Sequence, residues 1–593
     1  MNETKLKAKT GGQFLLEPIS NAEVYSREDF SEEHNDIYNM VMEFDRDKIL
    51  AQKVDIESYN PKLSQSLIKE MGELGLLGID IPEEYGGIDL DKVTSVIVAE
   101  ALVCSPSFAV TWAVQTGIGS LPIVWFGTKE QKEKYLPKVS TGEIICAYGL
   151  TEPSSGSDAI HSKTSAVLSE DGKHYILNGE KIFITNGGWA DIYTVFAQVD
   201  GDKFSAFLVE RGTEGFSIGA EEKKLGMKGS STTPLIFQNA MVPVENLIYK
   251  VGKGATIAFN CLNIGRCKLG ASCLGGSKMV INYTSKYAKE RRAFGQPISN
   301  LDAIAKKIAE MTIRTFAADT MIYRTIGLLQ SEIDKLDKSD PDYYINMGEA
   351  MEKFAIETSM VKVFGSDTSH YVIDEGLQIY GGYGFLEEYP MPSAYRDDRI
   401  NQIWEGTNEI NRQIISGFMI KKALMEEIPI REAIKEIETY MSNGEIKVEN
   451  DLLAEECHSI ETAKRFALYL FNEGLCKYGQ DLKHEQQITE IIADIFTDIY
   501  SAEGIVVRSQ KIMDSDFPDS SVIDIAKVYT AEMVNRIMSL THTVIAAIYT
   551  NNPSSLVDQK IIEFENRMRL KTNVIGLKRK IAQNVFESNG YPY

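Results

Sequence analysis

The sequence predicts a multidomain α+β protein in which a β-domain separates two helical domains and a further helical domain follows. Its 593 residues exceed what one compact core holds. Apolar residues recur three and four positions apart over both flanks, whereas short β-branched and aromatic runs fill the middle. We place the domains at residues 30–146 (N-terminal helical domain), 147–250 (middle β-domain), 251–425 (second helical domain, a four-helix bundle) and 426–593 (C-terminal helical extension).

The N-terminal flank carries two helical patterns, LSQSLIKEMGELGLLGI and VTSVIVAEALV. Between them, Pro82 and the pair Gly86-Gly87 predict a loop. The pattern changes near residue 147, where HYILNG, KIFITNG, DIYTVFAQV and FSAFLVE are separated by Gly, Asp and Asn. These runs predict strands, and their alternating polarity indicates sheets with one solvated face.

The helical period returns after Gly254, in segments such as LDAIAKKIAEMTIRTFAADTMIYRTIGLL. ETAKRFALYLFNEGLCKYG and ITEIIADIFTDIYSAEGIVVRSQKIM continue it beyond residue 430. The last segment, from Leu556 to about Phe586, alternates acidic and basic residues beside a modest apolar stripe. Docking on a membrane surface or on another subunit is open for this segment, and we prefer a helix packed in a dimer.

The composition excludes several classes of protein. The net charge of −23 disfavours nucleic-acid binding, which requires clustered Lys and Arg. Seven cysteines without a CxxC pair argue against a disulfide frame or a structural zinc site, so we expect a reducing compartment and no metal. No run reaches the roughly 18 apolar residues of a spanning helix, and the N-terminus lacks a secretory apolar region. These features predict a cytoplasmic protein.

The first chemical motif is Tyr148-Gly-Leu-Thr-Glu-Pro-Ser-Ser-Gly-Ser-Asp158, directly after an apolar strand. Its small residues and the hydroxyls of Thr151 and Ser157 would let a ligand approach the backbone closely. An ordinary Gly/Ser/Pro turn explains the segment equally well.

The second motif is Lys181-Ile-Phe-Ile-Thr-Asn-Gly-Gly188, a strand that ends in a Gly-Gly turn. A flat ring system could pack on its aromatic and hydroxyl side chains. Taken alone, the segment favours a hairpin whose Phe183 lies in the core.

The third motif is Ile403-Trp-Glu-Gly-Thr-Asn-Glu-Ile410. We expect Glu405 in a short non-helical stretch before a helix capped by Thr407 or Asn408. Desolvation beside Trp404 would raise the carboxyl pKa towards working pH, as a proton-abstracting base requires. A carboxylate favoured by the helix dipole is the alternative.

These motifs, in this order and in this domain arrangement, resemble the acyl-CoA dehydrogenase family. TEPSSGSD, ITNGG, Arg291-Arg-Ala-Phe-Gly295, Gln378-Ile-Tyr-Gly-Gly382 and EGTNEI follow the family's order over residues 30–420. FGTKEQKEKYLPK, LNGEKIFITNGGWADIYTVFA and FLVERG are closest to its very-long-chain branch, whose members also carry a C-terminal helical extension. The resemblance implies the acyl-CoA dehydrogenase fold followed by an additional C-terminal helical domain.

The resemblance implies FAD as cofactor and fatty acyl-CoA as substrate. It assigns Glu405 as catalytic base, because the alternative base position of some relatives is Gly265 here. The FAD contacts that it implies are Tyr148, Leu150, Thr151, Gly156, Ser157, Phe183, Thr185, Arg291, Phe294, Gln378, Gly381, Gly382, Thr407, Asn408 and Glu409. The substrate contacts that it implies are Ser157, Asn263, Arg266 and Gly406.

The implied reaction is α,β-dehydrogenation to a trans-2-enoyl-CoA in fatty acid β-oxidation, by a homodimer or homotetramer that passes electrons to an electron-transferring flavoprotein. Val110 and Val114, one helical turn apart, would suit a long acyl chain, although plain helix core explains them as well. An acyl-CoA oxidase, a short- or branched-chain dehydrogenase and a non-catalytic assembly protein remain as alternatives. Read without the family, Arg266 would be solvated surface.

Overall fold

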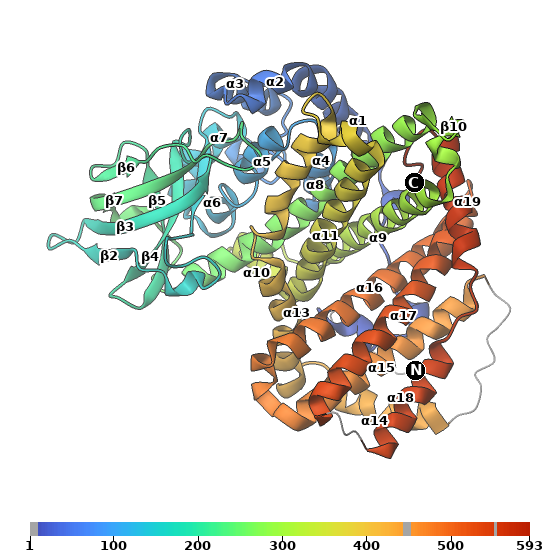
Figure 1. Cartoon of the computed structure of the whole chain (residues 1–593). Coiled ribbons are helices and arrows are strands. Elements are labelled where there is room, and N and C mark those ends of the chain that lie inside the picture. The colour runs from blue at the N-terminus through green and yellow to red at the C-terminus, as the bar shows by residue number, and fades with distance from the viewer. Residues whose placement is uncertain (1–9, 443–451, 551–553) are drawn as a thin grey trace.

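The computed structural model describes residues 10–442, 452–550 and 554–593 of the chain (Figure 1). Its N-terminal helices begin where the sequence supplies caps: the Asp91 carboxylate accepts from the Thr94 N–H at 2.7 Å, and Ser105 precedes Pro106 at the start of α5. The helices are α1 (Glu32–Phe44), α2 (Lys53–Glu57), α3 (Pro61–Glu73), α4 (Lys92–Ala101), α5 (Pro106–Gln115), α6 (Leu121–Phe126) and α7 (Lys129–Ser140).

The middle of the chain forms a predominantly antiparallel sheet with the order β6-β7-β3-β2-β4-β5-β8, and β1 pairs in parallel with β4. Burial alternates along β3, as predicted for a sheet with one solvated face. That prediction is wrong for β4, which is buried throughout, because its alternate side chains enter two different cores. The strands are β1 (Cys146–Gly149), β2 (Ser165–Leu168), β3 (His174–Thr185), β4 (Ile192–Val199), β5 (Lys203–Glu210), β6 (Phe216–Ile218), β7 (Thr232–Pro243) and β8 (Leu247–Ile248).

Long helices follow the sheet and form the centre of the molecule (Figure 1). They pack through apolar faces and meet the N-terminal helices in one continuous core. The elements are α8 (Gly254–Glu290), β9 (Arg292–Ala293), β10 (Gln296–Pro297), α9 (Asp302–Ile333), α10 (Tyr343–Ala350), α11 (Ala355–Tyr380), α12 (Pro390–Asp398) and α13 (Asn408–Leu424).

The C-terminal extension is helical and lies against α9 and α13 (Figure 1). Its helices are α14 (Ile430–Ser442), α15 (Ala454–Tyr478), α16 (Gln486–Met513), α17 (Ser521–Tyr549), α18 (Ser555–Met568) and α19 (Val574–Glu587). The final segment forms two helices where one was expected, and both pack within the chain: Phe564 stacks on Phe466 of α15, and Lys578 pairs with Glu310 of α9.

The arrangement of helical, β, helical and additional helical parts confirms the predicted fold class. The four domain limits remain our proposal. Within the described ranges, no helix combines the length and the apolar character needed to span a lipid bilayer.

Candidate active site

Glu405 lies in a sharp turn between α12 and α13. Its φ is 56° and that of Gly406 is 81°, so two consecutive residues adopt the left-handed conformation. This conformation is unfavourable for a residue with a side chain, and it persists where the surrounding structure enforces it, often at functional sites. Helix α13 then begins with Thr407 as its cap, whose hydroxyl accepts from the Ile410 N–H at 3.2 Å. The predicted non-helical stretch and cap are confirmed.

Two side chains hold this turn through its carbonyl groups. Asn411 Nδ2 donates to the carbonyl oxygens of Gly406 at 2.8 Å and of Thr407 at 3.1 Å. Arg266 Nε donates to the carbonyl oxygen of Glu405 at 3.2 Å, and Arg266 Nη1 donates to Asn263 Oδ1 at 2.7 Å. Arg266 and Asn411 therefore fix the backbone from two different helices.

The Glu405 carboxylate is buried and partly unpartnered. Its Oε2 atom is buried and accepts no hydrogen bond from any described residue. Burial raises the pKa of this carboxyl to about 7, and the positive charges of Arg266 and Lys362 only partly oppose the shift. A pKa near neutral pH suits a general base, because the ionised form is populated while the group still binds a proton well.

The residue that faces the carboxylate is Gly265. An ideal Cβ placed on Gly265 would lie 2.9 Å from Glu405 Oε2. Such a contact is too short, so a side chain at Gly265 would displace the carboxylate. The glycine therefore keeps the position in front of Glu405 open.

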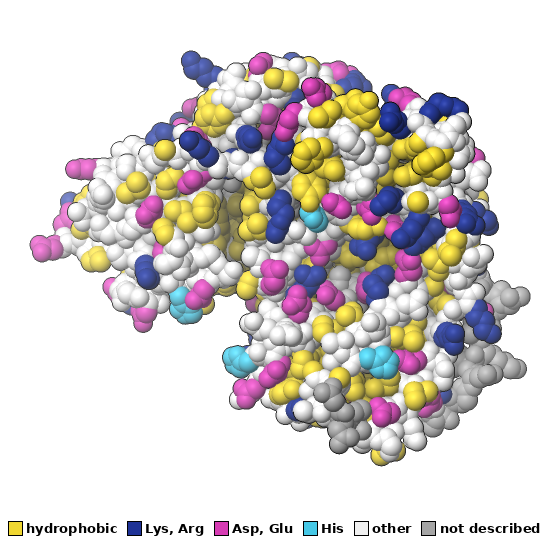
Figure 2. Space-filling view, viewed as in Figure 1, with side chains coloured by type: hydrophobic (Ala, Val, Ile, Leu, Met, Phe, Trp, Pro, Cys, Tyr) yellow, Lys and Arg dark blue, Asp and Glu magenta, His cyan; other side chains and the backbone are white. Residues whose placement is uncertain are grey.

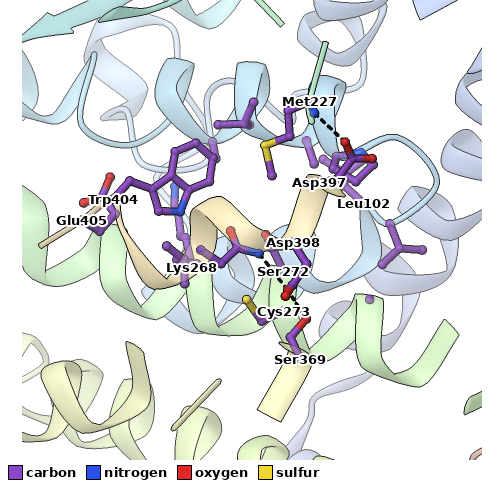
Figure 3. Close-up of a pocket in the computed structure, with 18 of the residues that line it drawn as sticks. Leu102, Met227, Lys268, Ser272, Cys273, Ser369, Asp397, Asp398, Trp404 and Glu405 are labelled. Carbon is purple, nitrogen blue, oxygen red and sulfur yellow. Dashed lines mark hydrogen bonds between the residues drawn. The ribbon is translucent and has the colours of Figure 1, made fainter. Parts of the chain in front are cut away.

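An apolar pocket runs away from Glu405 between α5, α8, α11 and α12 (Figure 3). Ile118, just after α5, lies 3.5 Å from the same Cβ position on Gly265 and marks the Glu405 end. At the opposite end, Val103 packs against Gly275 of α8. Helices α5 and α8 therefore form antiparallel walls along the length of the pocket.

Most polar side chains in these walls form hydrogen bonds with other residues of the protein. Ser369 Oγ donates to Asp398 at 2.6 Å, Asp397 accepts from the Met227 N–H at 2.5 Å, and Lys268 donates to the Thr116 carbonyl at 2.9 Å. Among the buried side-chain atoms of the pocket in the described part of the chain, only Trp404 Nε1 and Glu405 Oε2 have no partner. The buried polar atoms that remain free to bind a ligand therefore lie at the Glu405 end of the pocket (Figure 3).

The first group of predicted cofactor residues lies around the end of β1 and the end of β3. Tyr148 and Leu150 are buried, and the Tyr148 hydroxyl has no hydrogen-bond partner among the described residues. Thr185 lines the apolar pocket. Phe183 is 62% exposed with φ at 59°, so the interpretation of this side chain as core is wrong. The register of β3 with β7 shifts between Lys181 and Ile184, which accompanies this outward turn.

A second group gathers at a separate pocket beyond the end of α11. Arg291, Phe294, Gly381 and Gly382 line it together with several tyrosines. Phe294 is 90% exposed, and a Cβ on either glycine would meet no described atom within 4 Å. Figure 2 shows hydrophobic side chains gathered over the part of the surface where β10 lies.

The remaining predicted residues lie in different surroundings. Gly156 and Ser157 are exposed in the loop after β1, and Gln378 and Glu409 are exposed on helices. The Asn408 side chain is buried, where it accepts from Lys362 Nζ at 2.6 Å and donates to Asp367 at 2.7 Å. Asn263, Arg266 and Gly406 do not line the apolar pocket themselves but adjoin Glu405 through the contacts described above.

Arg266 is 4% exposed in the interior of α8, so the reading of this residue as solvated surface is wrong. Sequence reasoning missed Asn411 and Lys362. The signal for Asn411 was its place one helical turn after the cap Thr407, where a side chain can reach back to the preceding carbonyls. Lys362 carries no local signal, because only the packing of α11 beside the Glu405 turn brings it to the site.

Comparison with known proteins connects this geometry to a family. Four family models match: the N-terminal domain of acyl-CoA dehydrogenase at residues 31–143, the middle domain at 147–240, and two C-terminal domain models at 252–420 and 462–555. A probable acyl-CoA dehydrogenase of Bacillus subtilis is 42% identical over 98% of each chain. The very long-chain specific enzyme of rat mitochondria is 33% identical, over 77% of this chain and 72% of its own.

Solved structures agree with these matches. The crystal structure of an acyl-CoA dehydrogenase complexed with FAD from Bacillus anthracis has a TM-score of 0.95 and 41% identity, over 99% of this chain and all of the other. A structure described as an electron transferring flavoprotein of Acidaminococcus fermentans has a TM-score of 0.59 and 36% identity, over 67% of this chain and 98% of its own. The resemblance drawn from the five motifs is confirmed, and the chain belongs to the acyl-CoA dehydrogenase family.

Proposed function

We propose that the protein is an FAD-dependent dehydrogenase that converts a long-chain fatty acyl-CoA to the trans-2-enoyl-CoA in fatty acid β-oxidation, with Glu405 as catalytic base. The observation that carries this proposal is the unpartnered Glu405 Oε2 at one end of an otherwise apolar pocket. A carboxylate in that position can receive a proton from a substrate whose hydrocarbon tail fills the rest of the pocket.

We infer the proton step from the position of Glu405 in the pocket. The α C–H bond breaks and its proton moves to Glu405 Oε2, while the β-hydrogen leaves with its electron pair. The electrons of the α C–H bond form the double bond between the α and β carbons. Negative charge develops on the thioester oxygen, so hydrogen-bond donors are needed there. The backbone N–H of Glu405 donates to no acceptor within the described part of the chain, and Gly406 permits close approach of a ligand. We assign the thioester oxygen to this N–H group.

The substrate contacts that we propose are Ser157, Asn263, Arg266 and Gly406. Arg266 and Asn263 bond to each other, and Arg266 holds the carbonyl group of Glu405. Their contribution would therefore include positioning the base. Ser157 is exposed in the loop after β1, where it is available to a ligand.

FAD supplies the acceptor for the β-hydrogen and its electron pair when it is bound. The residues fit such a group, because Phe183 is exposed and the buried Tyr148 hydroxyl has no partner among the described residues. The open Gly381-Gly382 pair beside Arg291 forms a cradle that a Cβ would narrow. We assign FAD to the two groups of residues that the sequence analysis named.

The length of the pocket supports a long acyl chain. Its lining extends along α8 from Gly265 to Val280, which is about 22 Å at 1.5 Å per residue. One leaflet of a bilayer, the thickness of a lipid acyl tail, is roughly 15 Å. The pocket can therefore accept a tail of lipid length.

Partners of this enzyme are also part of the proposal. An electron-transferring flavoprotein as electron acceptor is proposed from the family resemblance. Exposed Phe294 and Phe385 near the second pocket support a homodimer or homotetramer, because a contiguous apolar surface favours association. Cytoplasmic localisation remains our expectation.

The test uses the purified protein loaded with FAD. Anaerobic addition of hexadecanoyl-CoA is expected to bleach the flavin absorbance and to yield the enoyl-CoA, detected by mass spectrometry. Glu405→Gln should lower the rate by about 10³-fold, within the range for loss of a general base, while an exposed control, Glu133→Gln on α7, should not. Failure of the wild type to bind FAD or to convert any acyl-CoA would contradict the proposal.

A further inference from the structure

Two adjacent glycines of α8 lie in different surroundings. A Cβ on Gly275 would lie 2.1 Å from the carbonyl oxygen of Glu100, so close packing of α4 against α8 requires a glycine there. A Cβ on Gly276 would meet no described atom within 4 Å. A glycine inside a helix costs about 1 kcal/mol relative to alanine, and packing gives no reason for that cost at Gly276.

Gly276 instead lines the apolar pocket, on the face of α8 that leads away from Glu405. It stands 11 residues beyond Gly265, which is about 16 Å along the helix axis. Val103, which packs against Gly275, lines the same region from the end of α4. Gly276 thus opens the pocket at roughly the distance from the base where an acyl tail of lipid length ends.

We propose that Gly276 determines the chain length of the substrate, by leaving space for the terminal carbons of an unbranched long-chain acyl group. This inference rests on the proposed function. Leu102, Pro106 and Val280 line the same pocket, and the carboxylate of Asp397 beside Leu102 already accepts from the Met227 N–H (Figure 3). The terminal segment that the pocket suits is therefore hydrocarbon. A side chain at Gly276 would occupy the same space and shorten the pocket.

The test is a graded series at Gly276 in the FAD-loaded enzyme, assayed with butyryl-, octanoyl-, dodecanoyl- and hexadecanoyl-CoA. Each methylene excluded from an apolar site is worth about fourfold in affinity. The ratio of kcat/KM for hexadecanoyl-CoA to that for butyryl-CoA should fall about fourfold in Gly276→Ala and at least about tenfold in Gly276→Leu. Calorimetric Kd values for the same thioesters, measured in the Glu405→Gln background, should follow this ratio without turnover.

Gly417 of α13 gives a matched control, since it is also a helical glycine whose Cβ would meet no described atom within 4 Å, but it lies outside the pocket. Gly417→Leu should leave the ratio unchanged. An unchanged ratio in Gly276→Leu, or an equal fall in Gly417→Leu, would overturn the inference. If the leucine variant does not fold, Gly276→Ala alone tests the inference, because its methyl group fits the open space without a clash and the variant should fold.

Failure of the inference and failure of the proposed function give different results. If the wild type converts hexadecanoyl-CoA and both Gly276 variants retain its ratio, only the role of Gly276 is wrong. If the wild type prefers butyryl-CoA, the long-chain substrate is wrong both in the proposed function and in the inference about Gly276. If the wild type converts none of the four thioesters, the proposed function itself fails.

Discussion

Two buried carboxylates of this protein have opposite surroundings. Asp319 of α9 receives Arg27 Nε at 2.7 Å, Lys278 Nζ at 2.5 Å and Arg508 Nη1 at 3.2 Å, and these charges hold its pKa well below the ordinary value despite burial. Glu405 Oε2 has no partner among the described residues, and burial raises its pKa.

The contrast indicates that Asp319 stabilises the fold, whereas Glu405 remains available to a ligand or a proton. The Asp319 cluster connects the segment before α1 with α8, α9 and α16, so its charges hold the C-terminal extension against α8 and α9. An ion that is fully paired has no capacity left for a ligand, whereas an unpaired one is destabilising until a ligand or proton arrives. Removing each carboxylate charge should therefore have opposite effects on stability.

The largest effect on stability is expected at the paired carboxylate. Asp319→Asn removes the anion that Arg27, Lys278 and Arg508 share. These cations keep Glu100 and Glu28 as partners, so the free energy of unfolding should fall by about 3 kcal/mol, the lower end of the range for a broken buried pair. Urea unfolding followed by circular dichroism measures the change. Asp302→Asn, which breaks a fully exposed pair with Arg579, should change the free energy of unfolding far less. Equal losses in the two variants would contradict the contrast.

The second largest effect is expected in how stability depends on pH, which should differ between the wild type and Glu405→Gln. The Glu405 pKa is raised in the folded state, so the native protein binds this proton more tightly, and ionisation destabilises it as pH rises from about 4.5 through about 7. At pH 8, Glu405→Gln should be more stable than the wild type by up to about 3 kcal/mol, and this gain should disappear below pH 4.5. A gain that is independent of pH would show that ionisation of Glu405 is not its source.

The same pKa predicts the pH dependence of the reaction. Protonated Glu405 cannot accept the α-proton, so log kcat/KM should fall with unit slope as pH decreases below about 7. Stopped-flow measurement with hexadecanoyl-CoA provides the profile. A plateau that extends down to pH 5 would indicate an ordinary carboxyl pKa and would contradict the role of burial.

The smallest effect is expected from the turn that holds the base. Asn411→Ala removes donors to the carbonyl groups of Gly406 and Thr407 and leaves the carboxyl group itself chemically unchanged. We expect a loss of roughly tenfold in kcat, because a misplaced base loses part of its positional advantage. The pH profile should keep its midpoint, and a shifted midpoint would mean that Asn411 acts on the charge of Glu405.

The sequence predicted the order of helical and β segments because these follow from local periodicity. It also predicted the turn at Glu405 and its cap, since Glu-Gly-Thr carries those signals locally. It could not predict the exposure of Phe183, which depends on a register shift between β3 and β7, or the burial of Arg266 inside α8. The positions of Lys362 and Gly276 at the site could not be predicted for the same reason, because helices distant in sequence surround them.

The central claim, that Glu405 takes the α-proton, is tested most directly by hydrogen exchange. An acyl-CoA analogue with sulfur at the β position has no β-hydrogen to lose, so only the α-proton step remains. In deuterium oxide, the FAD-loaded wild type should replace the α-hydrogens of the bound analogue with deuterium, seen by mass spectrometry, and Glu405→Gln should bind the analogue without exchange. Exchange at the wild-type rate in Glu405→Gln would show that another group is the base.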